Sequence, residues 1–237
     1  MTHVHNIKSQ RTYNSQYGRR WANNTLRLKK KIFPPICDYK LDKIQIDSES
    51  YMYISYDENA QAITKLIGDI LINIPCSDNE MTKIKDISIT DMTAGVGGNV
   101  LNFSKNMKSV TAIEINPIRY NNLINNISLY ECSNVLTFNE DAIDWLENND
   151  CFQDVIFIDP PWGGKRYKSF DKLRLSLGKF QLEDLVDYCF KNNRAKLLVL
   201  KLPTNYDFDH IKNALSSYKI FFHNIERMTI VIISNYQ

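Results

Sequence analysis

From Ile84 onward, short apolar runs rich in β-branched residues alternate with amphipathic stretches of helical length. The apolar runs predict strands near residues 86–91, 109–115, 134–138, 154–159 and 196–202. The stretches between them predict helices near residues 98–106, 117–130, 141–148 and 181–193. Strands that alternate with helices in this way form a mainly parallel sheet that is covered on both faces.

The end of the chain follows a different pattern. A helix predicted near residues 207–216 is followed by two predicted strands, Lys219–Asn224 and Met228–Ser234, which a short turn separates. This spacing predicts a hairpin, and a closing hairpin disfavours a plain dinucleotide dehydrogenase. The whole pattern resembles the α/β fold of S-adenosylmethionine-dependent methyltransferases, a Rossmann-like seven-stranded sheet with a terminal antiparallel hairpin.

Charge and the pattern of predicted elements together divide the chain into three parts. Residues 1–37 hold eight Lys and Arg residues and no acid, whereas the other 200 residues carry 21 basic and 27 acidic groups. This basic N-terminal arm predicts a polyanionic partner, with nucleic acid as the first candidate and a disordered solubilising tail as the alternative. Pro34-Pro35 marks the break between arm and body. We expect a helical lead-in segment over 38–80, with its helix near 57–72, and a catalytic core over 81–237.

Several classes of protein are disfavoured by composition. No apolar run approaches the ~20 residues that a membrane helix needs, and the N-terminus lacks a stretch resembling a secretion signal. The five cysteines are scattered and never form a C-x-x-C pattern, and no cluster of Cys and His has zinc spacing. We therefore expect an intracellular protein, cytoplasmic or nuclear, with reduced thiols, no bound metal and no membrane partner. The sequence leaves its oligomeric state open.

A glycine-rich turn follows the first predicted strand, in Asp91-Met92-Thr93-Ala94-Gly95-Val96-Gly97-Gly98-Asn99. The glycines permit a tight turn and a close approach of the backbone to a ligand. Their G-x-G-G spacing differs from the G-x-G-x-x-G of pyrophosphate binders, which disfavours NAD. Asp91 at the strand end can accept a hydrogen bond from a ligand amine, such as that of a sulfonium amino acid. The expected cofactor contacts in this turn are Asp91, Thr93, Gly95, Gly97 and Asn99.

Acids after the next two predicted strands complete the expected cofactor site. Glu114 lies 23 residues beyond Asp91 at the end of the second strand, where an acid can accept hydrogen bonds from both ribose hydroxyls. Asp141, next to Ala142 after the third strand, can accept from an adenine amino group. Three acids in register after three successive strands predict an adenosine cofactor, and the methyltransferase-like fold makes S-adenosylmethionine the expected one.

The fourth predicted strand leads into Asp159-Pro160-Pro161-Trp162-Gly163-Gly164. The Asp159 carboxylate and the Pro160 carbonyl are acceptors that can each receive one N–H, and the prolines stiffen the turn around them. Trp162 offers a large face on which a base can stack. The turn therefore predicts chemistry on the amino group of a flat base, with Asp159, Pro160 and Trp162 as catalytic residues. A turn that carries an ordinary core tryptophan is the alternative.

With these residues the chain resembles the trimethylguanosine synthase family, the RNA cap guanine-N2 methyltransferases, over roughly residues 50–205. The resemblance rests on the glycine-rich turn, on Ala112-Ile113-Glu114-Ile115-Asn116-Pro117, and on the turn after the fourth strand with Tyr167. It implies metal-free methyl transfer from S-adenosylmethionine to N2 of a 7-methylguanosine cap. Trp162 and Tyr167 would then form the pocket of a cationic base, while Lys165 and Arg166 would neutralise the cap triphosphate.

The chain also departs from the family pattern. Lys165-Arg166 replaces the usual proline after the double glycine, Glu114 stands where Asp is frequent, and Asp159 stands where many members have Ser. The last difference brings the site closer to the D/N-P-P-Y amino-methyltransferases of adenine or guanine. Two alternatives therefore stay open, an amino-methyltransferase of rRNA, tRNA or DNA bases and a non-catalytic cap- or RNA-binding module.

Overall fold

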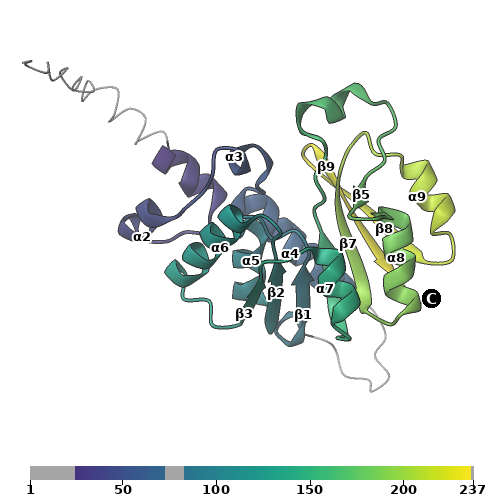
Figure 1. The fold of residues 1–237 in the computed structure, drawn as a ribbon, viewed down its shortest axis with the longest axis horizontal. Helices are drawn as coiled ribbons and strands as arrows, with labels where there is room; N and C mark the ends of the chain where they lie inside the picture. The colour runs from purple at the N-terminus through teal and green to yellow at the C-terminus, as the bar shows by residue number, and fades with distance from the viewer. Residues whose placement is uncertain (1–24, 73–82, 236–237) are drawn as a thin grey trace, which may run out of the picture.

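A single seven-stranded sheet organises the protein, which we describe from a computed structural model over residues 25–72 and 83–235 (Figure 1). The strand order is β3-β2-β1-β4-β7-β9-β8. These strands are β1 (Ser88–Asp91), β2 (Ser109–Ile113), β3 (Val135–Phe138), β4 (Gln153–Ile158), β7 (Ala195–Pro203), β8 (Lys219–Ile225) and β9 (Met228–Ser234). Neighbours from β3 to β7 pair in parallel, whereas β9 runs antiparallel to β7 and β8. The predicted α/β fold with its terminal antiparallel hairpin is confirmed.

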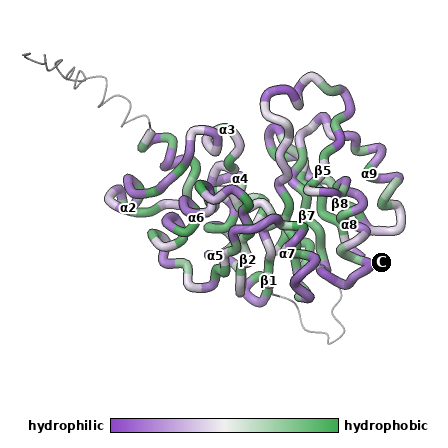
Figure 2. Tube along the Cα trace, in the orientation of Figure 1, coloured by the Kyte–Doolittle hydropathy of each residue, from purple (hydrophilic) through white to green (hydrophobic). Residues whose placement is uncertain are grey.

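Helices cover both faces of this sheet. One face packs against α4 (Asp57–Ile72), α5 (Gly98–Asn106) and α6 (Pro117–Leu129), and the other against α7 (Ala142–Asn148), α8 (Leu182–Lys191) and α9 (Phe208–Ala214). Both faces are apolar because side chains alternate along each strand. In β4, Val155 and Phe157 pack on the side of α4, α5 and α6, whereas Ile156 and Ile158 pack on the side of α7, α8 and α9. Figure 2 shows hydrophobic residues gathered along the central strands. No helix in the described ranges is long and apolar enough to cross a membrane.

The structure contains several short helices and strands that the sequence pattern did not predict. The lead-in contains α2 (Asp38–Lys43) and α3 (Ser50–Tyr53), and a 3-10 turn, η1 (Ile84–Asp86), precedes β1. After β4 come a second 3-10 segment, η2 (Gly164–Ser169), and a small antiparallel pair, β5 (Ser176–Leu177) and β6 (Phe180–Gln181). Elements of two to six residues are too short to reveal a period in a sequence.

The end of the basic arm packs onto the body of the protein. Residues 25–32 are helical, and Ile32 and Phe33 are fully buried in a cluster with Leu41 and Val96. Four of the eight basic residues of the arm fall in this described part. The other four lie among residues 1–24, outside the described residues, so the predicted contact between the arm and nucleic acid stays a prediction.

Candidate active site

The candidate site lies where the chain changes direction in the sheet. From β1 the chain runs outward through β2 and β3, and it returns to the other side of β1 to form β4 and β7. Asp91 ends β1 and Asp159 directly follows β4, and the two strands are neighbours, with Met92 N donating to Phe157 O at 3.0 Å. In open α/β sheets, ligands bind beyond the carboxyl ends of the strands at such a switch point.

The glycine-rich turn after β1 has the backbone geometry that its sequence indicates. Gly95 and Gly97 adopt φ values of +55° and +100°, a left-handed region that costs glycine little. Gly95 N donates to Glu114 Oε2 at 2.8 Å, which ties the turn to the end of β2. At Gly98, an added Cβ would lie 2.7 Å from Cγ1 of Ile54, so the lead-in requires a glycine there.

Asp91 is almost completely buried, with 1% of its surface exposed. Its Oδ1 accepts a hydrogen bond from Thr93 N at 3.0 Å. Burial, reinforced by the charges of Asp159 and Glu114, raises the pKa of Asp91 to about 7, although the Thr93 hydrogen bond and the Lys201 charge oppose the rise. A buried acid among other acids is stabilised in its ionised form by a nearby cation. The ammonium of an amino-acid cofactor would supply that cation.

The acids after β2 and β3 also lie at the strand ends. Glu114 is 7% exposed, and its Oε1 accepts from Asn116 N at 2.8 Å. Asp141 caps α7, because its Oδ1 accepts from Ile143 N at 2.7 Å, and Ala142 begins that helix. Each carboxylate has lone pairs beyond those engaged here and can accept from a ligand hydroxyl or amine. Their contacts with a cofactor stay predictions.

Asn99 provides an independent indication that a ligand belongs near the turn. It lies in the first turn of α5, it is 8% exposed, and its Oδ1 is buried without a hydrogen-bond partner among the described residues. A buried acceptor without a donor is costly. The turn, the three acids and Asn99 together offer acceptors and close backbone approach, which suit the ammonium, ribose and adenine of S-adenosylmethionine.

The turn after β4 is fixed to the turn after β1. Asp159 N donates to Thr93 Oγ1 at 2.8 Å, so Thr93 connects the acid that ends β1 with the acid that follows β4. Trp162 and Tyr167 are half-buried and meet edge to face, with ring centroids 5.3 Å apart and planes at 75°. Asn205 Nδ2 holds the following loop by donating to Tyr167 O at 2.8 Å. The structure thus brings the predicted aromatic residues together beside Asp159.

The remaining members of the predicted substrate site differ in exposure. Pro160 is buried, whereas Lys165 and Arg166 are exposed in η2. Gly163 and Gly164 precede them with φ values of +86° and +62°, a conformation in which glycine avoids strain. Lys165 and Arg166 are therefore accessible to an anionic group in solvent, and their predicted contact with phosphates remains a prediction.

Lys201 at the end of the fifth predicted strand is a member of the site whose contact with Asp159 the sequence did not predict. Its Nζ lies 2.5 Å from Asp159 Oδ2, and the two side chains are 6% and 19% exposed. Burial raises the pKa of Asp159 above its ordinary value, and the Lys201 charge opposes this rise. A lysine inside the apolar run Leu197–Leu202 is the signal that could have identified it, because a charge on a buried strand needs a partner.

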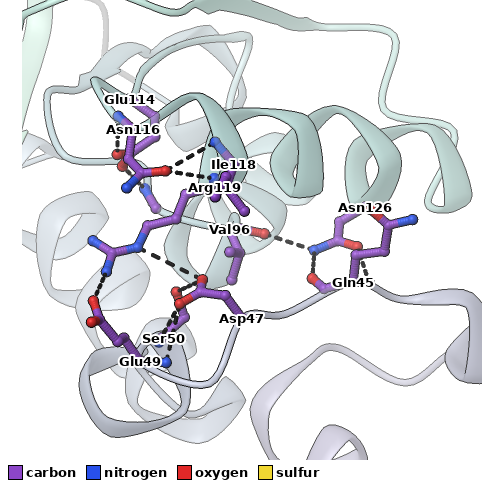
Figure 3. Close-up of polar contacts among 11 residues, drawn as sticks. Gln45, Asp47, Glu49, Ser50, Val96, Glu114, Asn116, Ile118, Arg119 and Asn126 are labelled. Carbon is purple, nitrogen blue, oxygen red and sulfur yellow. Dashed lines mark hydrogen bonds and ion pairs between the residues drawn. The ribbon is translucent and has the colours of Figure 1, made fainter.

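The lead-in segment is docked beside the cofactor turn by polar contacts (Figure 3). Arg119 of α6 binds Glu49, with Nη2 and Oε2 2.7 Å apart, and Asp47, with Nε and Oδ2 3.7 Å apart. Asn126 Nδ2 donates to both Gln45 O at 2.8 Å and Val96 O at 2.9 Å. The same helix therefore holds the lead-in and the glycine-rich turn.

A metal centre has no counterpart in the described part of the chain, where no group of three or more His, Cys, Asp or Glu side chains is arranged to hold an ion. The acids of the site are instead spread over the ends of β1, β2, β3 and β4. This is the arrangement expected for the separate polar groups of one extended ligand.

The fold and the site define a class, the S-adenosylmethionine-dependent methyltransferases. The precorrin-6y C5,15-methyltransferase of Geobacter metallireducens superposes with a TM-score of 0.55, at 17% identity over 83% of this chain and 95% of that one. A 16S rRNA N2 methyltransferase of T. Thermophilus, in complex with AdoMet and guanosine, gives 0.53 at 11% identity over 80% of this chain and 43% of that one. At these identities the likeness concerns the fold.

Sequence comparison defines the family within this class. The chain belongs to the RNA cap guanine-N2 methyltransferase family, whose model matches residues 87–235. It is 46% identical to an uncharacterized protein of Acanthamoeba polyphaga mimivirus, over 90% of this chain and 88% of that protein. It is 29% identical to the trimethylguanosine synthase of Schizosaccharomyces pombe, over 62% of this chain and 55% of that protein. The predicted family is confirmed.

Proposed function

We propose that this protein transfers a methyl group from S-adenosylmethionine to N2 of the guanine in a 7-methylguanosine RNA cap. The observation that carries the proposal is the position of the Asp159–Trp162 turn beside Asp91 at the switch point, with Thr93 joining the two turns. This position sets an amine-binding turn against the expected cofactor site. The family of the chain and its similarity to a trimethylguanosine synthase support the cap as substrate.

The reaction requires an amine that is aimed at an activated methyl group. S-adenosylmethionine would supply a methyl group on its sulfonium and leave as S-adenosylhomocysteine. Asp91 would hold its ammonium, and Glu114 would accept hydrogen bonds from its ribose hydroxyls. The amine of guanine is a poor nucleophile because its lone pair is delocalised into the ring. Asp159 and the Pro160 carbonyl accept hydrogen bonds from the two N–H groups of this amine and fix the direction in which it approaches the methyl group. Well-oriented approach lowers a barrier by roughly 7–11 kcal/mol, so positioning supplies a large share of the catalysis.

Trp162 provides the selectivity for a methylated cap. Methylation at N7 makes the guanine cationic, and a cation over an indole face gains electrostatic attraction in addition to stacking. Tyr167 packs edge to face against Trp162. The exposed Lys165 and Arg166, a few residues along the same loop, neutralise the cap triphosphate.

The test is a transfer assay with a labelled methyl group on S-adenosylmethionine. The acceptors are a 7-methylguanosine cap dinucleotide, the same dinucleotide without the N7 methyl group, and uncapped RNA. We expect transfer to the first acceptor alone. Equal transfer with and without the N7 methyl group would contradict the role of Trp162. Cofactor binding without transfer to any acceptor would favour a non-catalytic cap- or RNA-binding module.

A second candidate is an amino-methyltransferase of rRNA, tRNA or DNA bases. The observation that favours it is Asp159 itself, since an acid in this turn is typical of enzymes that methylate the amino groups of adenine or guanine. Such enzymes reach a base by extruding it from its stack. Transfer to uncapped RNA or DNA in the same assay would support this candidate against the cap.

A further inference from the structure

The contact between Lys201 and Asp159 is unusual in its setting. Lys201 lies near the end of β7 between Leu200 and Leu202, both fully buried, and its own side chain is 6% exposed. Burying an ion pair rarely stabilises a fold, because desolvation offsets the attraction between the charges. Two well-packed apolar residues would serve stability as well. The pair therefore calls for an explanation in the chemistry of the site.

The charges around Asp159 show what the lysine does. Asp91 faces it from the end of β1, Glu114 lies near Asp91 after β2, and Lys201 faces it from β7. Lys165 and Arg166, in the loop that follows, are exposed and screened by solvent. Burial raises the pKa of Asp159 and so favours its protonated form, whereas the charge and the hydrogen bond of Lys201 favour the ionised form.

The protonation state of Asp159 matters because the two forms bind an amine differently. An ionised carboxylate is acceptor-only, and its hydrogen bonds with N–H donors are stronger than those of a neutral acid. Lys201 Nζ contacts Oδ2, so Oδ1 can accept one N–H of an incoming amine. A protonated carboxyl group would carry a donor of its own in the same space.

Lys201 also touches the stacking residue. Its backbone oxygen accepts a hydrogen bond from Trp162 Nε1 at 3.3 Å, and its Nζ lies 5.7 Å from the centroid of the Trp162 ring. One residue of β7 therefore contacts both the proposed acceptor of the amine and the ring on which the base stacks. These contacts fix the acceptor and the ring relative to each other.

We propose that Lys201 is a positioning residue for methyl transfer, which keeps Asp159 ionised and leaves Oδ1 directed at the target amine. This inference rests on the proposed function for the identity of the amine. The lysine touches neither substrate nor cofactor, and it acts through Asp159. Its ammonium also offsets the charge of Asp159, one of the acids at the strand ends of the site.

The direct test measures the titration of Asp159 without any substrate. The full-length protein is labelled with ¹³C at the aspartate carboxyl carbons, and the Asp159 signal is assigned by its loss in Asp159→Asn. We expect Lys201→Met to raise the titration midpoint of Asp159 by about 1–3 pH units, since an opposite charge at this distance has that effect. An unchanged midpoint would overturn the inference. Lys201→Gln, which keeps a donor without the charge, gives the same comparison should the Met variant not fold.

The second test is the pH profile of kcat/KM for the acceptor, measured at saturating S-adenosylmethionine so that the titration of Asp91 does not set the acidic limb. Removal of Lys201 raises the pKa of Asp159, so the acidic limb of the profile should move to higher pH by the same amount. We expect Lys201→Arg to restore the limb towards its wild-type position, and the KM for S-adenosylmethionine to stay within about threefold. A uniform loss of activity, with no shift of the limb, would indicate a merely structural role and contradict the proposal.

Lys196→Met provides a matched control. Lys196 lies at the opposite end of β7 and pairs with Asp154 in the same way, with Nζ and Oδ1 2.7 Å apart. Its loss should leave the Asp159 midpoint and the pH profile unchanged.

The two proposals fail separately. A wild-type protein that transfers no methyl group to a cap contradicts the proposed function, whereas an unshifted Asp159 midpoint in an active protein contradicts the role of Lys201.

Discussion

Replacement of Asp91 by asparagine should change how stability depends on pH. In the folded protein the pKa of Asp91 is raised to about 7 from an ordinary value of 3.8, chiefly by burial. Each pKa unit corresponds to about 1.4 kcal/mol, so a shift of about three units corresponds to about 4 kcal/mol as an upper bound. The side chain is 1% exposed, so solvent screening reduces this little.

The sign of the effect follows from proton binding. Between pH 4 and pH 7 the folded protein keeps the Asp91 proton while the unfolded chain releases it. This acid therefore lowers the free energy of unfolding as pH rises through that window, and its effect levels off above pH 7. Asp91→Asn removes the contribution, so the variant should gain stability relative to wild type between pH 4 and pH 7.

Urea unfolding without cofactor, at half-unit steps from pH 4.5 to pH 8, measures this difference. Asp209→Asn is the matched control, because the Asp209 side chain is 75% exposed and its loss should leave the pH dependence unchanged. Parallel pH profiles for wild type and Asp91→Asn would refute the assignment of a raised pKa to Asp91.

The affinity for S-adenosylmethionine should depend on the same titration. The cofactor should bind wild type more weakly below pH 7, by up to about tenfold per pH unit, and bind Asp91→Asn without that dependence.

Three further substitutions test other parts of the site. Trp162→Ala should lower kcat/KM for the 7-methylated cap at least 100-fold through loss of stacking and cation–π attraction, about 3 kcal/mol together, with cofactor affinity within about threefold in calorimetry. Phe152→Ala, at the amino end of β4 and 46% exposed, is its control, and equal loss of cofactor binding by Trp162→Ala would contradict the assignment. Glu114→Gln should weaken S-adenosylmethionine binding about 10- to 100-fold, since hydrogen bonds to charged groups contribute about 1.5–3 kcal/mol, and an unchanged Kd would exclude the ribose contact. Gly98→Ala should cost about 1–3 kcal/mol of stability in urea, and Ile54→Ala should relieve part of that cost, because the added Cβ meets Ile54; additive losses would contradict the close approach.

The sheet could be predicted because its signal is local. The seven strands of this sheet are short apolar runs, and their ends in the structure lie within about two residues of the ends predicted from the sequence. The candidate site followed from the same pattern. Parallel strands end at one edge of a sheet, so Asp91, Glu114 and Asp141 had to lie there together.

The parts that were not predicted depend on contacts between distant segments. Residues 38–56 form helices of six and four residues, which the contacts of Arg119 and Asn126 hold in place. The pairing of Asp159 with Lys201 requires that β4 and β7 are neighbours, with Ile158 opposite Leu200. A pattern within one strand contains no information about its neighbour, so the charge at Lys201 was visible but its partner was not.

The most direct measurement of the proposed function is the identity of the methylated nucleoside. Capped RNA is incubated with the protein and labelled S-adenosylmethionine, then digested to nucleosides and analysed by mass spectrometry against synthetic standards. We expect the label in 7-methylguanosine that carries a methyl group on N2. Label in an adenosine, or in a guanosine that lacks the N7 methyl group, would contradict the assignment of Trp162 and Asp159 to a cationic cap base.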